Sequence, residues 1–327
     1  MKTPILDKII KVIKSMVKLP RIKQRGRPCI YKPKTITVMF AVMMLKKIVH
    51  FKSMHKFLIT NPGTAQLLGF KKSIPNRSTL SRRFKGIYDL IKQQVKSLGT
   101  LLIKKNITKA RIVSIDSTMH EARGPLWHKK DKAKGVIPDK LRNVDKEAEW
   151  GFSQYKHWVY GYKTHLLSTS SLNSIPVPID CEITKANPQD NTIALPVLKQ
   201  FSRRTTKYIL ADKGYDDQKL RTVCEPKRIR FVVPMKKYPN TKDARMPHIQ
   251  FYRSQFGRKI YAQRGKTIEP LFGYIKELFS TAKLKMKGFK NVRSYLSITI
   301  WLYQILICVN YTLKRPLRRL KYLVCAA

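Results

Sequence analysis

The chain has 327 residues, of which 43% are hydrophobic, so it is long and apolar enough to bury a core, and a disordered polybasic tail is excluded. It carries 68 Lys and Arg against 19 Asp and Glu, a formal net charge of +49. Positive charges in such excess repel one another, which predicts a polyanionic partner. Nucleic acid is the first expectation and an anionic membrane surface the second.

The N-terminal region predicts helices. Apolar residues between Ile5 and Val17 alternate with lysines, which indicates an amphipathic basic helix that docks on the body rather than a signal peptide. The apolar run at 35–48 predicts a buried helix. Near Pro75 a turn leads into another helix, capped by Asn76 or Ser78. Residues 1–105 are therefore expected to form a helical domain.

The polar, basic helix after Pro75 is the candidate for DNA contact. Its exposed side chains would be Arg77, Ser78 and Arg82. Short helices that end in a basic one are compatible with a helix-turn-helix DNA reader, which is the interpretation we favour. The alternative is a helical bundle with a basic face.

From about residue 108 the periodicity changes to that of strands. The strand candidates are 112–116, 158–167, 175–183, 208–212 and 230–234, with helix candidates at 191–201 and 217–223. This order predicts a mixed α/β sheet covered by helices on both faces. Residues 125–150 and 236–258 are charged and aperiodic, which predicts loops.

Three acidic residues occupy positions typical of a metal site. Asp116 and Asp212 each end an apolar strand candidate, and Glu269 opens a helical pattern. Strand ends of an open α/β sheet bring side chains together, and carboxylate oxygens suit hard divalent cations. Taken singly, each acid is more often a helix cap or an ion-pair partner than a ligand.

The helix around Glu269 is predicted to start with Thr267 as its cap, with Pro270 in the first turn, where a missing N–H costs little. Glu269 and Lys276 are seven residues apart, so they share one helix face. One can bind metal while the other reaches a phosphate.

The chain contains, in this order, the motifs PNRSTLSR at 75–82, SIDST at 114–118, GYKTH at 161–165, TKANPQD at 184–190, LADKGYD at 210–216 and YAQRGKTIEPLFGYIK at 261–276. These motifs resemble those of DDE transposases of prokaryotic insertion sequences, in particular the superfamily of insertion sequences four and five. The last resembles the Tyr–Arg–Glu–Lys signature of that family, with six residues between Glu269 and Lys276. Four residues separate Arg264 from Glu269, where the commonest form has three.

The resemblance covers residues 25–313 and implies a ribonuclease-H-like catalytic domain after an all-α DNA-binding domain. The implied limits are 1–105 for the DNA-binding domain, 106–313 for the catalytic domain with a basic insertion around 225–260, and 314–327 for a basic tail. It implies that Asp116, Asp212 and Glu269 hold two Mg²⁺ ions, for which Mn²⁺ can substitute. The implied DNA contacts beyond the helical domain are Tyr261, Arg264 and Lys276.

The remaining motif residues are open to more than one interpretation. Lys163 either contacts DNA or is an exposed strand lysine. His165 is expected to be packed or hydrogen-bonded rather than a metal ligand. Asn187 and Asp190 are expected to shape a turn beside the site, and Tyr162 is expected in the core.

The implied activity is cut-and-paste transposition: DNA strand cleavage followed by transesterification into target DNA. The implied partners are double-stranded DNA, as terminal inverted repeats and as target, and a second copy of the chain. Cysteines without metal-ligand spacing and the basic charge favour a cytoplasmic, nucleoid-associated protein without a membrane partner. The alternatives are a catalytically silent DNA-binding descendant, and a membrane protein anchored by residues 294–313, whose polar side chains instead favour a buried helix.

Overall fold

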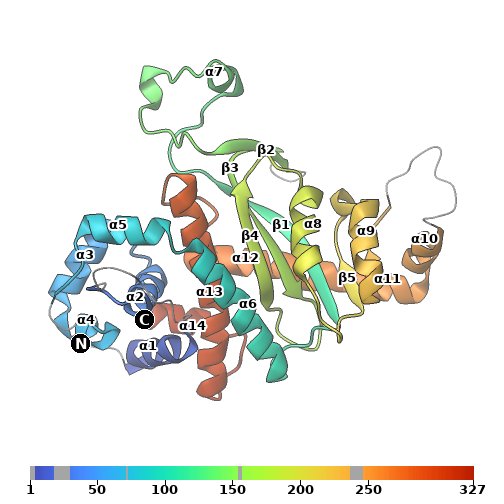
Figure 1. Cartoon of the computed structure of the whole chain (residues 1–327), viewed down its shortest axis with the longest axis horizontal. Helices are drawn as coiled ribbons and strands as arrows, with labels where there is room; N and C mark the ends of the chain where they lie inside the picture. The colour runs from blue at the N-terminus through green and yellow to red at the C-terminus, as the bar shows by residue number, and fades with distance from the viewer. Residues whose placement is uncertain (1–3, 18–29, 71–72, 154–156, 236–245) are drawn as a thin grey trace. The chain divides into compact units, whose positions relative to one another are not determined.

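The computed structural model describes residues 4–17, 30–70, 73–153, 157–235 and 246–327 (Figure 1). The chain forms two compact units. Unit 1 contains residues 1–98, 121–148 and 275–327, and unit 2 contains residues 99–120 and 149–274. Each unit therefore draws on segments that are distant in the sequence.

Unit 1 is helical. Its helices are α1 (Pro4–Met16), α2 (Pro33–Leu45), α3 (Phe51–Thr60), α4 (Pro62–Leu68), α5 (Arg77–Lys85), α7 (Lys129–Ala133), α13 (Phe289–Thr312) and α14 (Lys321–Cys325). Helix α6 (Tyr88–Lys104) begins in unit 1 and ends in unit 2. The Asn76 side chain accepts a hydrogen bond from the Thr79 backbone N–H at 2.9 Å, so Asn76 caps α5 and Ser78 lies inside it.

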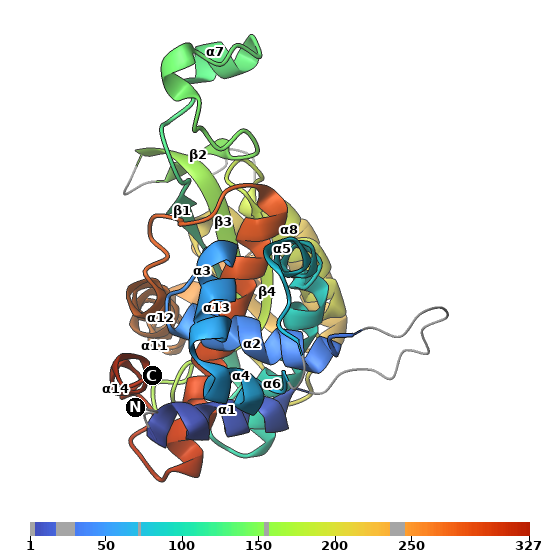
Figure 2. The same cartoon turned by 90° about the vertical axis from the view of Figure 1, so that its left-hand side faces the viewer.

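Helix α13 is the central helix of unit 1 and packs against α1, α2 and α5 (Figure 2). It is long and apolar enough to cross a membrane, but 94% of its most apolar window is buried inside the protein. Its Gln304 donates a hydrogen bond from Nε2 to the Val95 carbonyl at 2.9 Å. A buried core helix passes the same length and hydropathy test as a membrane span, and the burial of α13 fits that interpretation.

Unit 2 contains the mixed sheet. Its strands are β1 (Ile112–Glu121), β2 (Glu149–Ser153), β3 (His157–Thr169), β4 (Pro178–Lys185), β5 (Tyr208–Leu210) and β6 (Arg230–Val232). The strand order is β2-β3-β1-β5-β6, and β4 pairs with β3. Pairs β1–β5 and β5–β6 are parallel, whereas β2–β3 and β3–β4 are antiparallel. The predicted mixed sheet flanked by helices, after a helical region, is confirmed.

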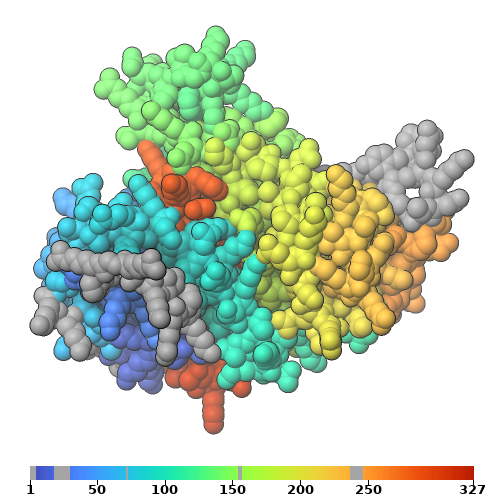
Figure 3. Space-filling model, in the orientation of Figure 1, coloured from blue at the N-terminus to red at the C-terminus, as the bar shows by residue number. Residues whose placement is uncertain are grey.

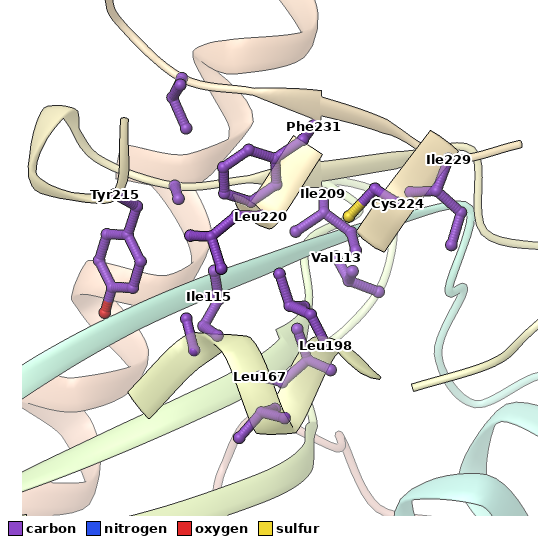
Figure 4. Close-up of a cluster of buried hydrophobic side chains, with 14 of the residues drawn as sticks. Val113, Ile115, Leu167, Leu198, Ile209, Tyr215, Leu220, Cys224, Ile229 and Phe231 are labelled. Carbon is purple, nitrogen blue, oxygen red and sulfur yellow. The ribbon is translucent and has the colours of Figure 1, made fainter. Parts of the chain in front are cut away.

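Side chains alternate along these strands and divide between two cores. On one face lie Val113, Ile209 and Phe231, covered by α8 (Asp190–Gln200) and α9 (Gln218–Cys224) (Figure 4). In the space-filling view, the atoms of α8 and α9 hide much of the sheet behind them (Figure 3). Apolar side chains on both faces explain why these short strands read as continuous apolar runs.

The opposite face of the sheet presents Ile112, Leu210 and Val232. It is covered by α10 (Met246–Arg253) and α11 (Gln255–Tyr261), which contribute Phe251 and Ile260. The prediction of a loop at 236–258 is therefore wrong for its second half. The polar composition of this segment gives little sign of a helix, but packing against the sheet stabilises α10 and α11. Residues 236–245, within the predicted basic insertion, lie outside the described residues.

Helix α12 (Gln263–Phe279) begins earlier than predicted. Thr267 lies inside its second turn rather than at its cap, and Pro270 is also inside the helix. Pro270 has no N–H to donate to the Lys266 carbonyl, but both residues are exposed, so water can satisfy that carbonyl. The earlier start places Arg264 on the first turn of the helix.

Candidate active site

The two aspartates are brought together by the parallel pairing of β1 with β5. Ser114 lies opposite Leu210 in this pair. Asp116 follows Ser114 by two residues within β1, whereas Asp212 lies just beyond the end of β5, where its side chain caps a short 3-10 helix by accepting from the Gly214 N–H at 2.8 Å. Asp116 shares the parity of Ile112 on β1, and Asp212 is near enough for its charge to act on Asp116 and on Tyr261 of α11.

Asp116 is the buried member of this pair, with 7% of its surface exposed. Burial raises the pKa of Asp116 to about 7, although Arg264 acts to lower it, and the negative charge of Asp212 raises it further. A carboxyl with this pKa is partly protonated at neutral pH. A divalent metal ion bound to this carboxyl would favour the ionised form more strongly than Arg264 does.

Arg264 joins Asp116 to the third acidic residue. Its Nη2 lies 2.7 Å from Asp116 Oδ2, and its Nη1 lies 2.8 Å from Glu269 Oε1. The planar guanidinium can hold two carboxylates at once because its donors are fixed in a fork. The Arg264 side chain is only 12% exposed, whereas that of Glu269 is 53% exposed. The longer Arg264–Glu269 spacing therefore still allows direct contact.

A divalent cation suits these donors by their chemistry, since all three are carboxylates. Within the described part of the chain, no group of three His, Cys, Asp or Glu side chains is close enough to hold a metal. The Arg264 guanidinium supplies the positive charge between Asp116 and Glu269 instead. Metal binding to all three would require Arg264 to leave at least one of them.

A chain of buried hydroxyls connects α12 to β1 beneath the acidic residues. Ser170 Oγ donates to Ser114 Oγ at 2.6 Å, and Thr267 Oγ1 lies 3.0 Å from Ser170 Oγ. Ser114 stands two residues before Asp116 and Thr267 two before Glu269. These contacts fix the helix that carries Glu269 against the strand that carries Asp116. The sequence signal for Ser114 is its position two residues before Asp116, which places both side chains on the same face of β1.

Lys163 lies inside unit 2, with 6% of its surface exposed. Its Nζ donates to Asp190 Oδ1 at 2.7 Å and to the Pro188 carbonyl at 2.9 Å. The expectation of an exposed strand lysine is wrong, because β3 carries side chains into the protein on both of its faces at this position. These contacts use the ammonium internally, so we do not favour Lys163 as a DNA contact.

His165 is hydrogen-bonded, as expected, with Nε2 3.0 Å from Thr184 Oγ1. Burial lowers the pKa of His165 to about 4, although Asp190 acts to raise it, so the ring is neutral at neutral pH. Tyr162 is fully buried, also as expected. Neither residue presents a charge to the acidic group.

The other candidate DNA contacts lie in different places. Tyr261 is half-buried near Arg264, with its ring 5.1 Å from that of Tyr252, and burial raises the pKa of Tyr261 to about 12. Lys276 stands two turns after Glu269 on α12. Arg77, Ser78 and Arg82 are exposed on α5 in unit 1, where Arg82 also lines a cavity of about 710 Å³.

Comparison with known proteins gives one match in sequence. The family profile described as "Transposase DDE domain" matches residues 107–305. No curated protein sequence matches the chain.

Two of the solved structures that match the chain are transposase complexes. A cryo-EM structure of a piggyBac transposase synaptic complex with hairpin DNA has a TM-score of 0.42 at 11% identity, over 98% of this chain and 76% of that chain. The crystal structure of a pre-cleavage Mos1 transpososome has a TM-score of 0.19 at 14% identity, over 90% of this chain and 82% of that chain. With TM-scores this low, only the sequence match identifies a family.

Proposed function

The chain belongs to the family with a transposase DDE domain, which its residues 107–305 match, and from this membership we propose that it catalyses cut-and-paste transposition of an insertion sequence. The observation that supports the proposal is that Asp116 on β1 and Asp212 just after the neighbouring strand β5 are close enough to interact electrostatically, with Glu269 tied to Asp116 through Arg264. Such an arrangement serves phosphodiester chemistry on a polyanion.

In this proposal Asp116, Asp212 and Glu269 are the catalytic carboxylates and the ligands for Mg²⁺ or Mn²⁺. The chemistry that two divalent ions supply, when bound, is activation of the attacking oxygen and stabilisation of the leaving oxygen. Asp116 gives up its proton on becoming a ligand, because burial otherwise keeps it partly protonated. Arg264 then exchanges a carboxylate for a DNA phosphate, which its forked donors fit equally well.

The bond changes follow the family chemistry. A water oxygen bonds to phosphorus at the element end, the bond from phosphorus to the 3′-oxygen breaks, and a 3′-hydroxyl is freed. That hydroxyl attacks a target phosphodiester and displaces another 3′-oxygen in a transesterification. We propose that Lys276 holds a phosphate nearby and that Tyr261, whose raised pKa keeps it protonated, donates a hydrogen bond there.

The proposed partners are double-stranded DNA, as the terminal inverted repeats and as the target, and a second copy of the chain that joins two ends. Arg77, Ser78 and Arg82 on α5 are the proposed contacts to the inverted repeat. A net charge of +49 supports a polyanionic partner. The proposed location is the nucleoid in the cytoplasm.

The test uses labelled DNA from the flanks of the reading frame, with Mg²⁺ and purified protein. Asp116→Ala, Asp212→Ala and Glu269→Ala are each expected to abolish cleavage. Glu225→Ala is the matched control and should cleave like the wild type, because Glu225 is an exposed acid of the same unit whose side chain lies 3.9 Å from His248. Retained cleavage by any of the three variants would contradict the assignment.

A catalytically silent DNA-binding descendant is the second candidate. The observation in its favour is that Arg264 already pairs with both Asp116 and Glu269. If wild-type protein shifts the flanking DNA in a gel but nicks it in neither Mg²⁺ nor Mn²⁺, this second function holds. Cleavage in either ion rejects it.

A further inference from the structure

We propose that Asp190 is a positioning residue for Asp116, that it acts through the Ser117 hydroxyl, and that Lys163 holds Asp190 in place. The proposal rests on the function proposed above, since it concerns how Asp116 is prepared to bind a divalent cation. Neither Ser117 nor Asp190 needs to touch DNA or metal in this role.

Two hydrogen bonds of Ser117 link Asp116 to Asp190. Its backbone N–H donates to Asp116 Oδ1 at 2.9 Å, and its hydroxyl donates to Asp190 Oδ2 at 2.8 Å. The first contact fixes one oxygen of Asp116 toward the strand. The other oxygen, Oδ2, is the one that Arg264 reaches. The Ser117 backbone N–H therefore leaves Oδ2 as the oxygen of Asp116 that faces Arg264, and we infer that the bond from the Ser117 hydroxyl to Asp190 holds this backbone in position.

Asp190 is itself held on both oxygens. Its Oδ1 accepts from Lys163 Nζ at 2.7 Å, which leaves Oδ2 for Ser117. The Lys163 side chain is 8% exposed and that of Asp190 26% exposed, so the ion pair is mostly shielded from water. Asp190 also lies in the first turn of α8, where the helix dipole favours a negative charge. Lys163 and α8 thus hold the Asp190 carboxylate in place for its hydrogen bond with Ser117.

The contacts form one continuous path through unit 2. It runs from Lys163 to Asp190, Ser117, Asp116 and Arg264, and ends at Glu269. His165 Nδ1 lies 3.8 Å from Asp190, but its neutral ring adds no charge to the path. Some side chains hydrogen-bond to a metal ligand without binding the metal themselves. Removing such a side chain typically lowers metal affinity roughly 10- to 100-fold.

The test measures Mn²⁺ binding to the full chain without DNA, by electron paramagnetic resonance of the free ion. Ser117→Ala removes the hydroxyl but keeps the backbone N–H to Asp116. It is expected to weaken Mn²⁺ binding by about tenfold, with a urea midpoint close to that of the wild type. Ser117→Thr keeps a hydroxyl and is expected to restore the affinity, which a purely structural role of the serine would not explain.

A double-variant comparison tests the path itself. Asp190→Asn should weaken Mn²⁺ binding like Ser117→Ala, and combining the two should weaken it no further, because both break one path. Asp217→Asn is the matched control, because Asp217 accepts hydrogen bonds from Asn191, the neighbour of Asp190 on α8, at 2.9 Å and from the Lys219 N–H at 2.8 Å rather than from Ser117. It should bind Mn²⁺ like the wild type.

The outcomes separate the two proposals. If the wild type binds no Mn²⁺, or if Asp116→Ala binds it unchanged, the proposed function fails and this inference fails with it. If the wild type binds Mn²⁺ through Asp116 but Ser117→Ala binds it equally well, only the role of Asp190 is overturned. Multiplying losses in the double variant would also overturn it. Should Asp190→Asn not fold, the Ser117→Ala and Ser117→Thr pair still decides.

Discussion

The protonation state of Asp116 is set by interactions that oppose one another. Burial and the neighbouring charge of Asp212 favour the protonated acid, while Arg264 and the Ser117 backbone N–H favour the carboxylate. The pKa of about 7 means that burial prevails in the protein without metal. Ionising Asp116, which is proposed to bind a metal ion, therefore costs free energy as long as no metal ion is bound.

This balance predicts a pH dependence of stability. The pKa of Asp116 rises from 3.8 to about 7 on folding, so its contribution is full below pH 4 and is lost as the pH rises through about 7. Between pH 5 and pH 8 the metal-free wild type should lose about 2–3 kcal/mol of unfolding free energy more than Asp116→Asn, which cannot ionise. Urea titrations at both pH values measure this. Parallel losses in the two proteins would contradict it.

Arg264 predicts a second measurable effect at this scale. Arg264→Gln leaves Asp116 and Glu269 without their cation, so the metal-free variant should lose about 2–4 kcal/mol of stability. Mn²⁺ should then raise its Tm by more than it raises that of the wild type, because no guanidinium competes for the carboxylates.

The control for this prediction is Arg258→Gln on α11. Arg258 is exposed and its side chain donates to the Arg253 carbonyl, so the same substitution there should change neither quantity. A metal-free Arg264→Gln protein as stable as the wild type would show that the two ion pairs contribute nothing.

Among the elements, α12 is placed by hydroxyls as much as by apolar packing. Thr267, Ser170 and Ser114 form a buried chain between the helix, the segment after β3, and β1. Buried hydroxyls left without a partner cost free energy, so each member depends on the others. This arrangement ties the position of Glu269 to the strand of Asp116.

Thr267→Val should therefore destabilise the protein by about 1–2 kcal/mol and reduce cleavage. Thr312→Val is the control, because Thr312 makes the same type of bond to the carbonyl four residues earlier, at 2.9 Å, but is exposed. Its stability should change by less than about 0.5 kcal/mol. Urea denaturation monitored by Trp fluorescence compares the two, and equal losses would reject a special role for Thr267.

The elements also show what a sequence can and cannot predict. Apolar runs such as Ile112–Ile115 and Tyr208–Leu210 predicted strands, because a strand buried on both faces must be apolar throughout. Helices α10 and α11 were missed because their stabilising contacts, such as Ile260 on Leu210, are distant in sequence. The motifs pointed to Asp116, Asp212 and Glu269, but not to the contact of Arg264 with two of them. Nor did periodicity show that Lys163 is buried, since its partner Asp190 lies on another element.

For the molecule as a whole, charge predicts how binding responds to salt. If about eight phosphates are neutralised, log K for flanking DNA should fall with log salt at a slope near −7. Fluorescence anisotropy at a series of KCl concentrations measures the slope, and a flat response would contradict the polyanionic partner.

The salt dependence of single variants distinguishes the basic residues that contact DNA from those that do not. Arg82→Ala should reduce the slope by about 1, because Arg82 is exposed on α5. Lys163→Met should leave it unchanged, because that ammonium is already engaged by Asp190. A reduced slope for Lys163→Met would restore Lys163 as a DNA contact.

The alternation of side chains along β5 makes the number of residues there as important as their identity. Only Ala211 separates Leu210 from Asp212, and one added glycine would turn the aspartate to the opposite face, among the apolar side chains under α8 and α9. Two added glycines would return it to the original face, one step further along. Cleavage assays should find the single insertion inactive and the double insertion the less damaged of the two. Insertion of a single codon between Leu210 and Asp212 can therefore inactivate such a protein, although every residue of its acidic site is retained.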